Sequence, residues 1–171
     1  SDLRLDMHNN QDLYGLDMTI EVAKNLLAKS LPVSFVFTVS SLESGADVFN
    51  KGLSKIKEYG ITDHFLLISE KLSFVRLIEN ADIVIRPTNT DGDALTVREA
   101  IYFSKTTIAS DVVSRPEGTV LFKTRNNEDL EQKLETEINR VLSANHPLGN
   151  AVTPQEDYKS FYSGLMNSVA E

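Results

Sequence analysis

The loop 86–93, which reads RPTNTDGD, is the most unusual stretch of the sequence and the best candidate for chemistry. It follows a predicted strand and leads into a predicted helix that carries Glu99. Asp91 and Gly92 form a dipeptide that is typical of a turn. The first backbone amides of a helix have no partner within it, and together they can bind a phosphate.

Three amides would belong to the first turn of this helix, namely those of Asp93, Ala94 and Leu95. The alternative is an ordinary helix start, in which acidic residues complement the helix dipole and bind no ligand. Acidic first turns are common, so the residues of the loop taken alone leave both interpretations open.

Short runs of β-branched and aromatic residues alternate with segments of helical period, and these elements must position the loop. The predicted strands are 3–7, 33–39, 65–68, 83–85, 107–109 and 119–122. Apolar residues recur every three or four positions in five segments between and after them: Leu16, Ile20, Ala23 and Leu27; Phe49, Leu53 and Ile56; Leu72, Val75 and Ile78; Leu95, Val97 and Ile101; Leu130, Leu134, Ile138 and Val141. We expect each of these segments to be a helix with one face on a sheet.

This alternation predicts one α/β domain over residues 1–171, a Rossmann-like, doubly wound parallel sheet flanked by helices. The strands are apolar along most of their length, which predicts burial on both faces of the sheet. An extra C-terminal helix is expected from Pro154 to about Val169, with Thr153 as its N-cap.

Composition excludes several classes of function. The 171 residues include no cysteine, so neither a disulfide nor a thiolate metal site can form, and this fits a cytoplasmic protein. A formal net charge of −8 disfavours binding to nucleic acid or to anionic lipid. No pair of histidines has metal-ligand spacing, so we expect no metal.

Residues 81–109 (ADIVIRPTNTDGDALTVREAIYFSKTTIA) resemble the sugar-nucleotide-binding segment of GT-B retaining glycosyltransferases of the "group 1" family. Members of that family carry two acidic residues separated by seven others, as Asp91 and Glu99 are here. The resemblance continues, in the same order along the chain, through segments 14–28, 61–81, 110–117 and 121–130.

The resemblance implies a role for each residue of the loop and helix. Asp91 would contact the donor sugar at the catalytic centre, and Glu99 would bind the ribose of the nucleotide. His8 stands near the place of a family arginine. The diphosphate would be bound by the amides of Gly92, Asp93, Ala94, Leu95 and Thr96. The ligand is then a nucleotide-sugar used as donor substrate, with no cofactor and no metal.

Two departures from the family pattern concern charge. The first acidic residue is usually Glu in the family, and the family commonly has Arg and then Lys before a glycine, whereas Tyr14 precedes Gly15 here. These cations neutralise the diphosphate during transfer. The candidates to replace them are Arg86, Arg98 and Arg115, and the alternative is that all three are ordinary solvated arginines.

The resemblance covers only the C-terminal, donor-binding half of a GT-B enzyme, so we expect the N-terminal, acceptor-binding domain to be absent from this chain. The full-length protein would transfer a sugar to a glycan or lipid-linked acceptor in cell-surface polysaccharide biosynthesis, such as that of capsule or lipopolysaccharide. It would be cytoplasmic, with peripheral association at the inner face of the membrane. The isolated domain would transfer little or nothing.

Two alternatives remain. The absence of the family lysine and the replacement of Glu by Asp91 are compatible with a degenerate, non-catalytic GT-B domain that acts as a scaffold. A nucleotide-sugar epimerase of GT-B type would use a similar fold.

Overall fold

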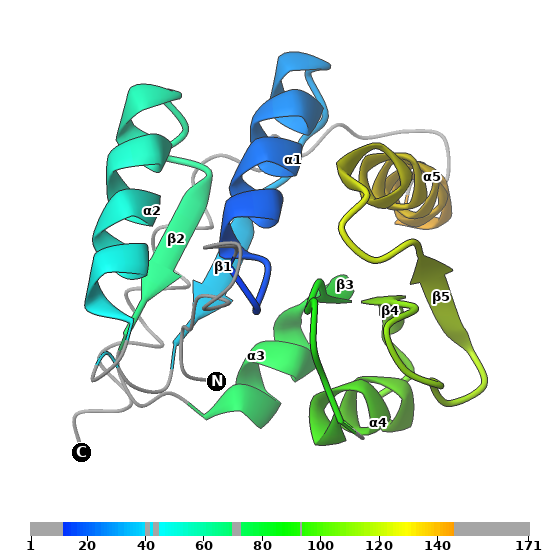
Figure 1. The fold of residues 1–171 in the computed structure, drawn as a ribbon. Coiled ribbons are helices and arrows are strands. Elements are labelled where there is room, and N and C mark those ends of the chain that lie inside the picture. The colour runs from blue at the N-terminus through cyan, green and yellow to red at the C-terminus, as the bar shows by residue number, and fades with distance from the viewer. Residues whose placement is uncertain (1–11, 40–41, 43–44, 70–72, 93, 146–171) are drawn as a thin grey trace.

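Strands and helices alternate along the part of the chain that the computed structural model describes, which is residues 12–39, 42, 45–69, 73–92 and 94–145. Figure 1 shows their arrangement. In chain order they are α1 (Leu16–Ala28), β1 (Phe35–Thr38), α2 (Ala46–Glu58), β2 (Phe65–Ile68), α3 (Phe74–Asn80), β3 (Ile83–Arg86), α4 (Leu95–Tyr102), β4 (Thr106–Ser110), β5 (Thr119–Phe122) and α5 (Asn127–Asn145).

Every strand pairing in the described residues is parallel. β1 pairs with β2, and β4 pairs with β3 on one side and with β5 on the other. The strands thus form a two-stranded and a three-stranded sheet, and β1 and β3 are not paired with each other. A parallel pair needs a connection that crosses over from one strand to the next. α2 lies in the connection between β1 and β2 and α4 in that between β3 and β4, whereas the loop 111–118, which contains no helix, joins β4 to β5.

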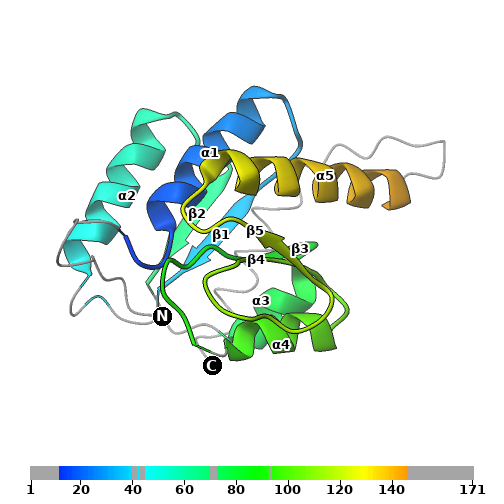
Figure 2. The same cartoon turned by 45° about the vertical axis from the view of Figure 1, so that its right-hand side comes forward.

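The helices lie in two layers with the strands between them (Figures 1 and 2). One layer holds α1, α2 and α5, and α1 packs against both of the others. The second layer holds α3 and α4, which pack against each other. This arrangement confirms the predicted doubly wound, Rossmann-like fold.

The core centres on α1, whose apolar stripe is fully buried. Leu16, Ile20 and Leu26 of α1 and Leu130 and Leu134 of α5 belong to the same hydrophobic cluster. Burying each such side chain contributes about 1.5–3 kcal/mol.

Some predictions of burial are wrong. Leu53 of α2 and Leu95 of α4 are exposed, because the buried face of α2 runs through Phe49 and Ile56 and that of α4 through Val97. Val75 of α3 and the strand residues Leu66 and Leu121 are exposed as well. The two strand residues lie in β2 and β5, each at an edge of its described sheet.

The predicted strand at 3–7 and the predicted helix after Pro154 lie outside the described residues. Among the described helices, none combines the length and the apolar character that crossing a membrane requires.

Candidate functional site

The candidate site lies at the carboxyl ends of β3 and β4. β3 ends at Arg86, and the loop that follows leads into α4. β4 ends at Ser110, whose hydroxyl donates a hydrogen bond of 2.7 Å to the backbone carbonyl of Thr88. Because neighbouring parallel strands end at the same edge, residues from both loops meet here, which is where ligands bind in open α/β sheets.

Asp91 is held between two arginines. Arg86 donates from Nε to Oδ2 at 3.1 Å and from Nη2 to Oδ1 at 3.0 Å, which makes a bidentate pair. Arg115 donates from Nη1 to Oδ2 at 2.8 Å. Arg115 comes from the loop after β4, so this contact ties the two loops together.

Two further donors complete the surroundings of the Asp91 carboxylate. The Thr88 hydroxyl donates to Oδ2 at 3.1 Å, and the Gly92 amide donates to Oδ1 at 3.0 Å. A carboxylate offers about four lone-pair sites, so five donors saturate it. The Asp91 side chain is only 7% exposed, and a ligand hydroxyl would have to displace one of these bonds.

The expectation of solvated arginines is wrong for Arg86 and Arg115. The Arg115 side chain is 2% exposed, and its other two nitrogens donate to the backbone carbonyl and the hydroxyl of Ser110. The Arg86 side chain is 20% exposed. Arg98, by contrast, lies on the exposed side of α4.

Among the described residues, which do not include Asp93, no side chain caps the N-terminus of α4. Its N-cap residue, Ala94, has an extended backbone and no side-chain cap hydrogen bond. Gly92, two positions before Ala94, has open space on its side-chain side, since an added Cβ would meet no atom within 4 Å. The amides of Leu95 and Thr96 therefore lie in a helical turn that no N-cap side chain closes.

The N-terminus of α1 is closed by contrast. The Asp12 carboxylate accepts hydrogen bonds from the amides of Tyr14 at 2.8 Å, of Leu16, and of Asp17 at 3.2 Å. Asp12 thus occupies the positive end of this helix, where an anionic ligand would otherwise bind.

A second contact fixes the start of α1 against the loop after β3. Asn89 donates from its side chain to the Asp12 carbonyl and from its amide to the Leu13 carbonyl, the latter at 2.8 Å. Gly15 packs so closely on Pro87 that an added Cβ would lie 2.2 Å from its carbonyl oxygen. Asp12 and Asn89 are not among the residues predicted from the sequence. An aspartate shortly before a predicted helix is a capping signal that could have identified the first.

Glu99 lies in the second turn of α4 and is partly buried. Its neighbours Val97 and Ala100 face the core. The predicted contact between Glu99 and a ribose stays a prediction, as does the predicted contact between Asp91 and the sugar. His8 and Asp93 lie outside the described residues.

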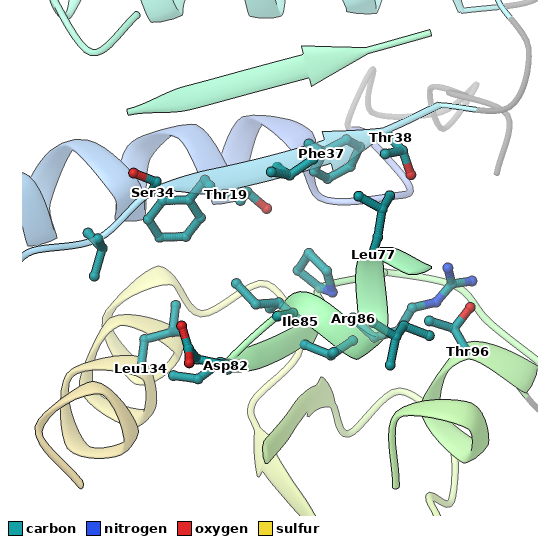
Figure 3. Close-up of a pocket in the computed structure, with 18 of the residues that line it drawn as sticks. Thr19, Ser34, Phe37, Thr38, Leu77, Asp82, Ile85, Arg86, Thr96 and Leu134 are labelled. Atoms are coloured by element: carbon teal, nitrogen blue, oxygen red, sulfur yellow. The ribbon is translucent and has the colours of Figure 1, made fainter. Parts of the chain in front are cut away.

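A cavity of about 490 Å³ lies between β1 and β3 (Figure 3). In the figure Arg86 and Thr96 lie together at one end of the cavity, and Asp82 and Leu134 lie at the other. The first end is the carboxyl end of the strands. Arg86 and, from the first turn of α4, Thr96 line this end of the cavity.

No metal centre is evident in this region. Among the residues that the structure describes, no group of three or more His, Asp or Glu side chains could hold a metal ion.

The comparisons with known proteins by sequence gave no match to a family model and no significant match to a curated protein. Comparison of the structure gave several. A glycosyltransferase from Rickettsia africae has 15% identity and a TM-score of 0.67 over 75% of this chain and 35% of its own. TarM from S. aureus has 19% identity and a TM-score of 0.65 over 77% of this chain and 27% of its own.

The C-terminal domain of LpcC, a group 1 family glycosyl transferase from Francisella tularensis, has 19% identity and a TM-score of 0.67. The match covers 74% of this chain and 70% of that domain. This chain thus matches about a third of the length of the Rickettsia protein, about a quarter of TarM and most of the LpcC domain. The chain therefore has the Rossmann-like fold of the C-terminal domain of GT-B glycosyltransferases.

Proposed function

We propose that this chain is the donor-binding domain of a retaining glycosyltransferase that transfers a sugar from a nucleotide-sugar to a glycan or lipid-linked acceptor. One observation carries the proposal. The guanidinium of Arg86 and the side chain of Thr96, in the first turn of α4, lie together at the carboxyl end of β3, which is the edge where ligands bind in parallel sheets (Figure 3).

Each group has a role that suits a nucleoside diphosphate. The amides from Asp93 to Thr96 donate to the diphosphate oxygens, the Gly92 amide joins them when it exchanges its hydrogen bond to Asp91 for one to the ligand, and the positive end of the helix dipole favours the charge of the diphosphate. The Glu99 carboxylate accepts hydrogen bonds from the two ribose hydroxyls. Arg86 supplies a cation to the same diphosphate.

The comparisons support the choice of ligand without determining it. One structure of TarM is a complex with UDP, and its other ligands include alpha-GlcNAc-glycerol and Fondaparinux. A shared fold does not by itself imply a shared function, so the proposal depends on the site. The sugar, the base and the acceptor are left open.

The acceptor-binding half of the enzyme is proposed to be a separate domain of a longer protein. Transfer requires donor and acceptor to be held in near-attack geometry, and one side of a cleft does not supply this. We therefore expect this chain to bind a nucleotide-sugar and to transfer little or nothing alone. The full-length protein is proposed to act in the cytoplasm at the inner face of the membrane, in cell-surface polysaccharide synthesis.

Calorimetric titration with the diphosphates of uridine, guanosine and adenosine tests the proposal. One of the three should bind, and Glu99→Ala should weaken its binding roughly ten-fold, since hydrogen bonds to a charged group contribute about 1.5–3 kcal/mol. Glu58→Ala, at the exposed end of α2, is the matched control and should bind like the unmodified chain. No heat with any nucleotide at millimolar concentration would contradict the proposal.

A non-catalytic donor domain is the second candidate, and one observation favours it. The Asp91 carboxylate, which the family resemblance assigns to the donor sugar, is saturated by its own neighbours. Transfer activity in the full-length protein that is lost in Asp91→Ala would exclude this candidate. If neither the full-length protein nor its Asp91→Ala variant transfers a sugar, the non-catalytic candidate is favoured.

A further inference from the structure

A charged cluster at the site consists of the side chains of Asp91, Arg86 and Arg115, which are mostly buried. Among the described residues it contains two guanidinium groups and one carboxylate, which give these three side chains a net charge of +1. An uncompensated buried charge is unfavourable, and buried charges are found paired. An anion at the edge of the cluster would complete the pairing.

The two arginines are not equivalent. All three nitrogens of Arg115 are engaged, by Asp91 and by Ser110, and the side chain is almost fully buried. The Arg86 side chain is 20% exposed and lies beside Thr96 at the carboxyl end of β3 (Figure 3). Asp91 uses two of the five N–H donors of Arg86 and leaves the other three directed away from it. Only Arg86 is therefore placed to meet a ligand.

We infer that Asp91 is a positioning residue, which fixes the guanidinium of Arg86 so that Arg86 binds the diphosphate of the donor. The inference depends on the proposed function and assigns Asp91 a role that differs from contact with the sugar. Arg115 and Thr88 anchor Asp91 from the other side. The cluster thereby supplies the positive charge that Tyr14 does not supply in the loop before α1.

The guanidinium group of Arg86 is planar, and its orientation is fixed by residues from two loops. A guanidinium can bind a phosphate through two parallel hydrogen bonds only when its plane has the correct orientation. The bidentate contact with Asp91 fixes that plane, and the Arg115 contact fixes Asp91. Lysine has a similar charge but no fork, so it cannot be oriented in this way.

The test is a set of calorimetric titrations on the full chain with UDP and UDP-glucose, or with the guanosine or adenosine pair if that base binds instead. Arg86→Lys should weaken UDP binding roughly ten-fold, which is the expected loss of a charge-assisted hydrogen bond. Binding of uridine, which has no phosphate, should not change. Arg76→Lys makes the same replacement at an exposed site on α3 and should leave all three affinities unchanged.

Asp91→Asn separates the two roles of Asp91. A positioning role predicts that UDP and UDP-glucose lose affinity by the same factor, so their ratio stays constant. A sugar contact predicts unchanged UDP binding and a selective loss for UDP-glucose. Thermal unfolding of each variant shows whether it is folded, and Arg86→Lys keeps the test decisive if Asp91→Asn does not fold.

The possible failures are distinguishable. If the unmodified chain binds no nucleoside diphosphate, the proposed function fails and the inference fails with it. If the chain binds one and Arg86→Lys binds it equally well, the inference alone is wrong. Unchanged or stronger UDP binding by folded Asp91→Asn would also overturn it.

Discussion

At the scale of single residues, the titration of Asp91 reports on its arginine partners. Burial of the carboxylate raises its pKa, but hydrogen bonds from Arg86 and Arg115 outweigh burial and lower the pKa from 3.8 to about 2. The folded protein therefore binds a proton at Asp91 less readily than the unfolded chain does. The resulting stability is complete above about pH 4 and is lost as the pH falls toward 2. It corresponds to at most roughly 2 kcal/mol.

We predict that Asp91→Asn unfolds at lower urea concentration than the unmodified chain at pH 6, and that the gap narrows between pH 4 and pH 2. The reason is that protonation removes the same charge that the substitution removes. Burial raises the pKa of Asp12, so the contribution of Asp12 to stability changes with pH in the opposite sense. Asp12 is present in both the unmodified chain and Asp91→Asn, and its contribution therefore cancels from the difference between them. Urea unfolding from pH 2 to 6 measures the gap. A gap that is independent of pH would count against the ion pairs.

Two glycines of the site make a matched pair for a second prediction. Gly15→Ala should destabilise the chain by roughly 2–3 kcal/mol, because Gly15 has a positive φ of 76° and no room for a Cβ beside Pro87. Gly92→Ala should leave the unfolding free energy unchanged, because the space beside Gly92 is open. The added methyl would then obstruct only a ligand.

Urea unfolding and nucleotide titration of both variants check this pair. Gly92→Ala should unfold like the unmodified chain and bind nucleoside diphosphate several-fold more weakly. If Gly92→Ala binds as well as the unmodified chain, the diphosphate does not approach this turn.

The sequence predicted the loop 86–93 as the candidate site, and that assignment stays a prediction. It did not predict the partners of Asp91. The spacing of Asp91 and Glu99 and the turn at Gly92 were visible in the sequence. Arg115 is 24 positions beyond Asp91, and only the pairing of β3 with β4 brings the two together. Because parallel strands end at one edge, the sequence could have predicted that Arg86 and Ser110 lie close together. It could not have predicted that the Arg115 side chain points toward Asp91.

At the scale of helices, the N-termini of α1 and α4 differ in what occupies them. The Asp12 carboxylate accepts hydrogen bonds at α1, and no N-cap side chain does so at α4. We predict that Asp12→Ala lowers the unfolding free energy by about 1–2 kcal/mol, which is the usual effect of losing a capping side chain.

Asp17→Ala is the control for Asp12→Ala, because Asp17 lies in the first turn of the same helix and is exposed. It should lower the free energy by only about 0.5 kcal/mol, through the helix dipole. Urea unfolding at neutral pH compares the two. Equal losses would mean that Asp12 acts only through its charge.

At the scale of strands, the sequence predicts a strand at 3–7, which lies outside the described residues. Residues 12 and 13 are bonded to Asn89 at the carboxyl end of β3, so a parallel strand ending shortly before them would run between β1 and β3. Both facing edges there lack a strand partner among the described residues. Leu5→Pro, which removes a ladder donor, should lower the unfolding free energy by roughly 2 kcal/mol or more.

Leu5→Ile keeps both the amide and the apolar side chain and serves as the control for Leu5→Pro. Thermal or urea unfolding of the two variants makes the comparison. If Leu5→Pro is as stable as Leu5→Ile, the segment does not belong to the sheet.

The described helices and strands could be predicted because apolar residues recur with a different period in each. Which residues of a helix are exposed was harder to predict. Leu53 and Leu95 match a helical period but lie beside the buried stripe instead of within it. A period of 3.6 fixes the residues that share a face only to within one neighbour. Which neighbour is buried depends on the sheet beneath the helix, and the sequence of the helix does not contain that information.

At the scale of the whole molecule, two layers of helices leave one edge of the strands as the place for a ligand (Figures 1 and 2). The alternation of elements was sufficient to predict this architecture. The cavity between β1 and β3 follows the two strand edges that have no partner among the described residues, and these are the edges between which the predicted strand 3–7 would run. The chain matches only a part of the Rickettsia protein and of TarM, so its activity is best tested as binding.

The central claim is that the first turn of α4 binds a nucleoside diphosphate. NMR titration of the ¹⁵N-labelled chain with UDP, GDP and ADP tests it most directly. The account predicts that, with the nucleotide that binds, the amides of Gly92, Leu95, Thr96 and Glu99 shift most. Saturable shifts centred instead on Ser34, Asp82 and Leu134, at the opposite end of the cavity, would contradict it.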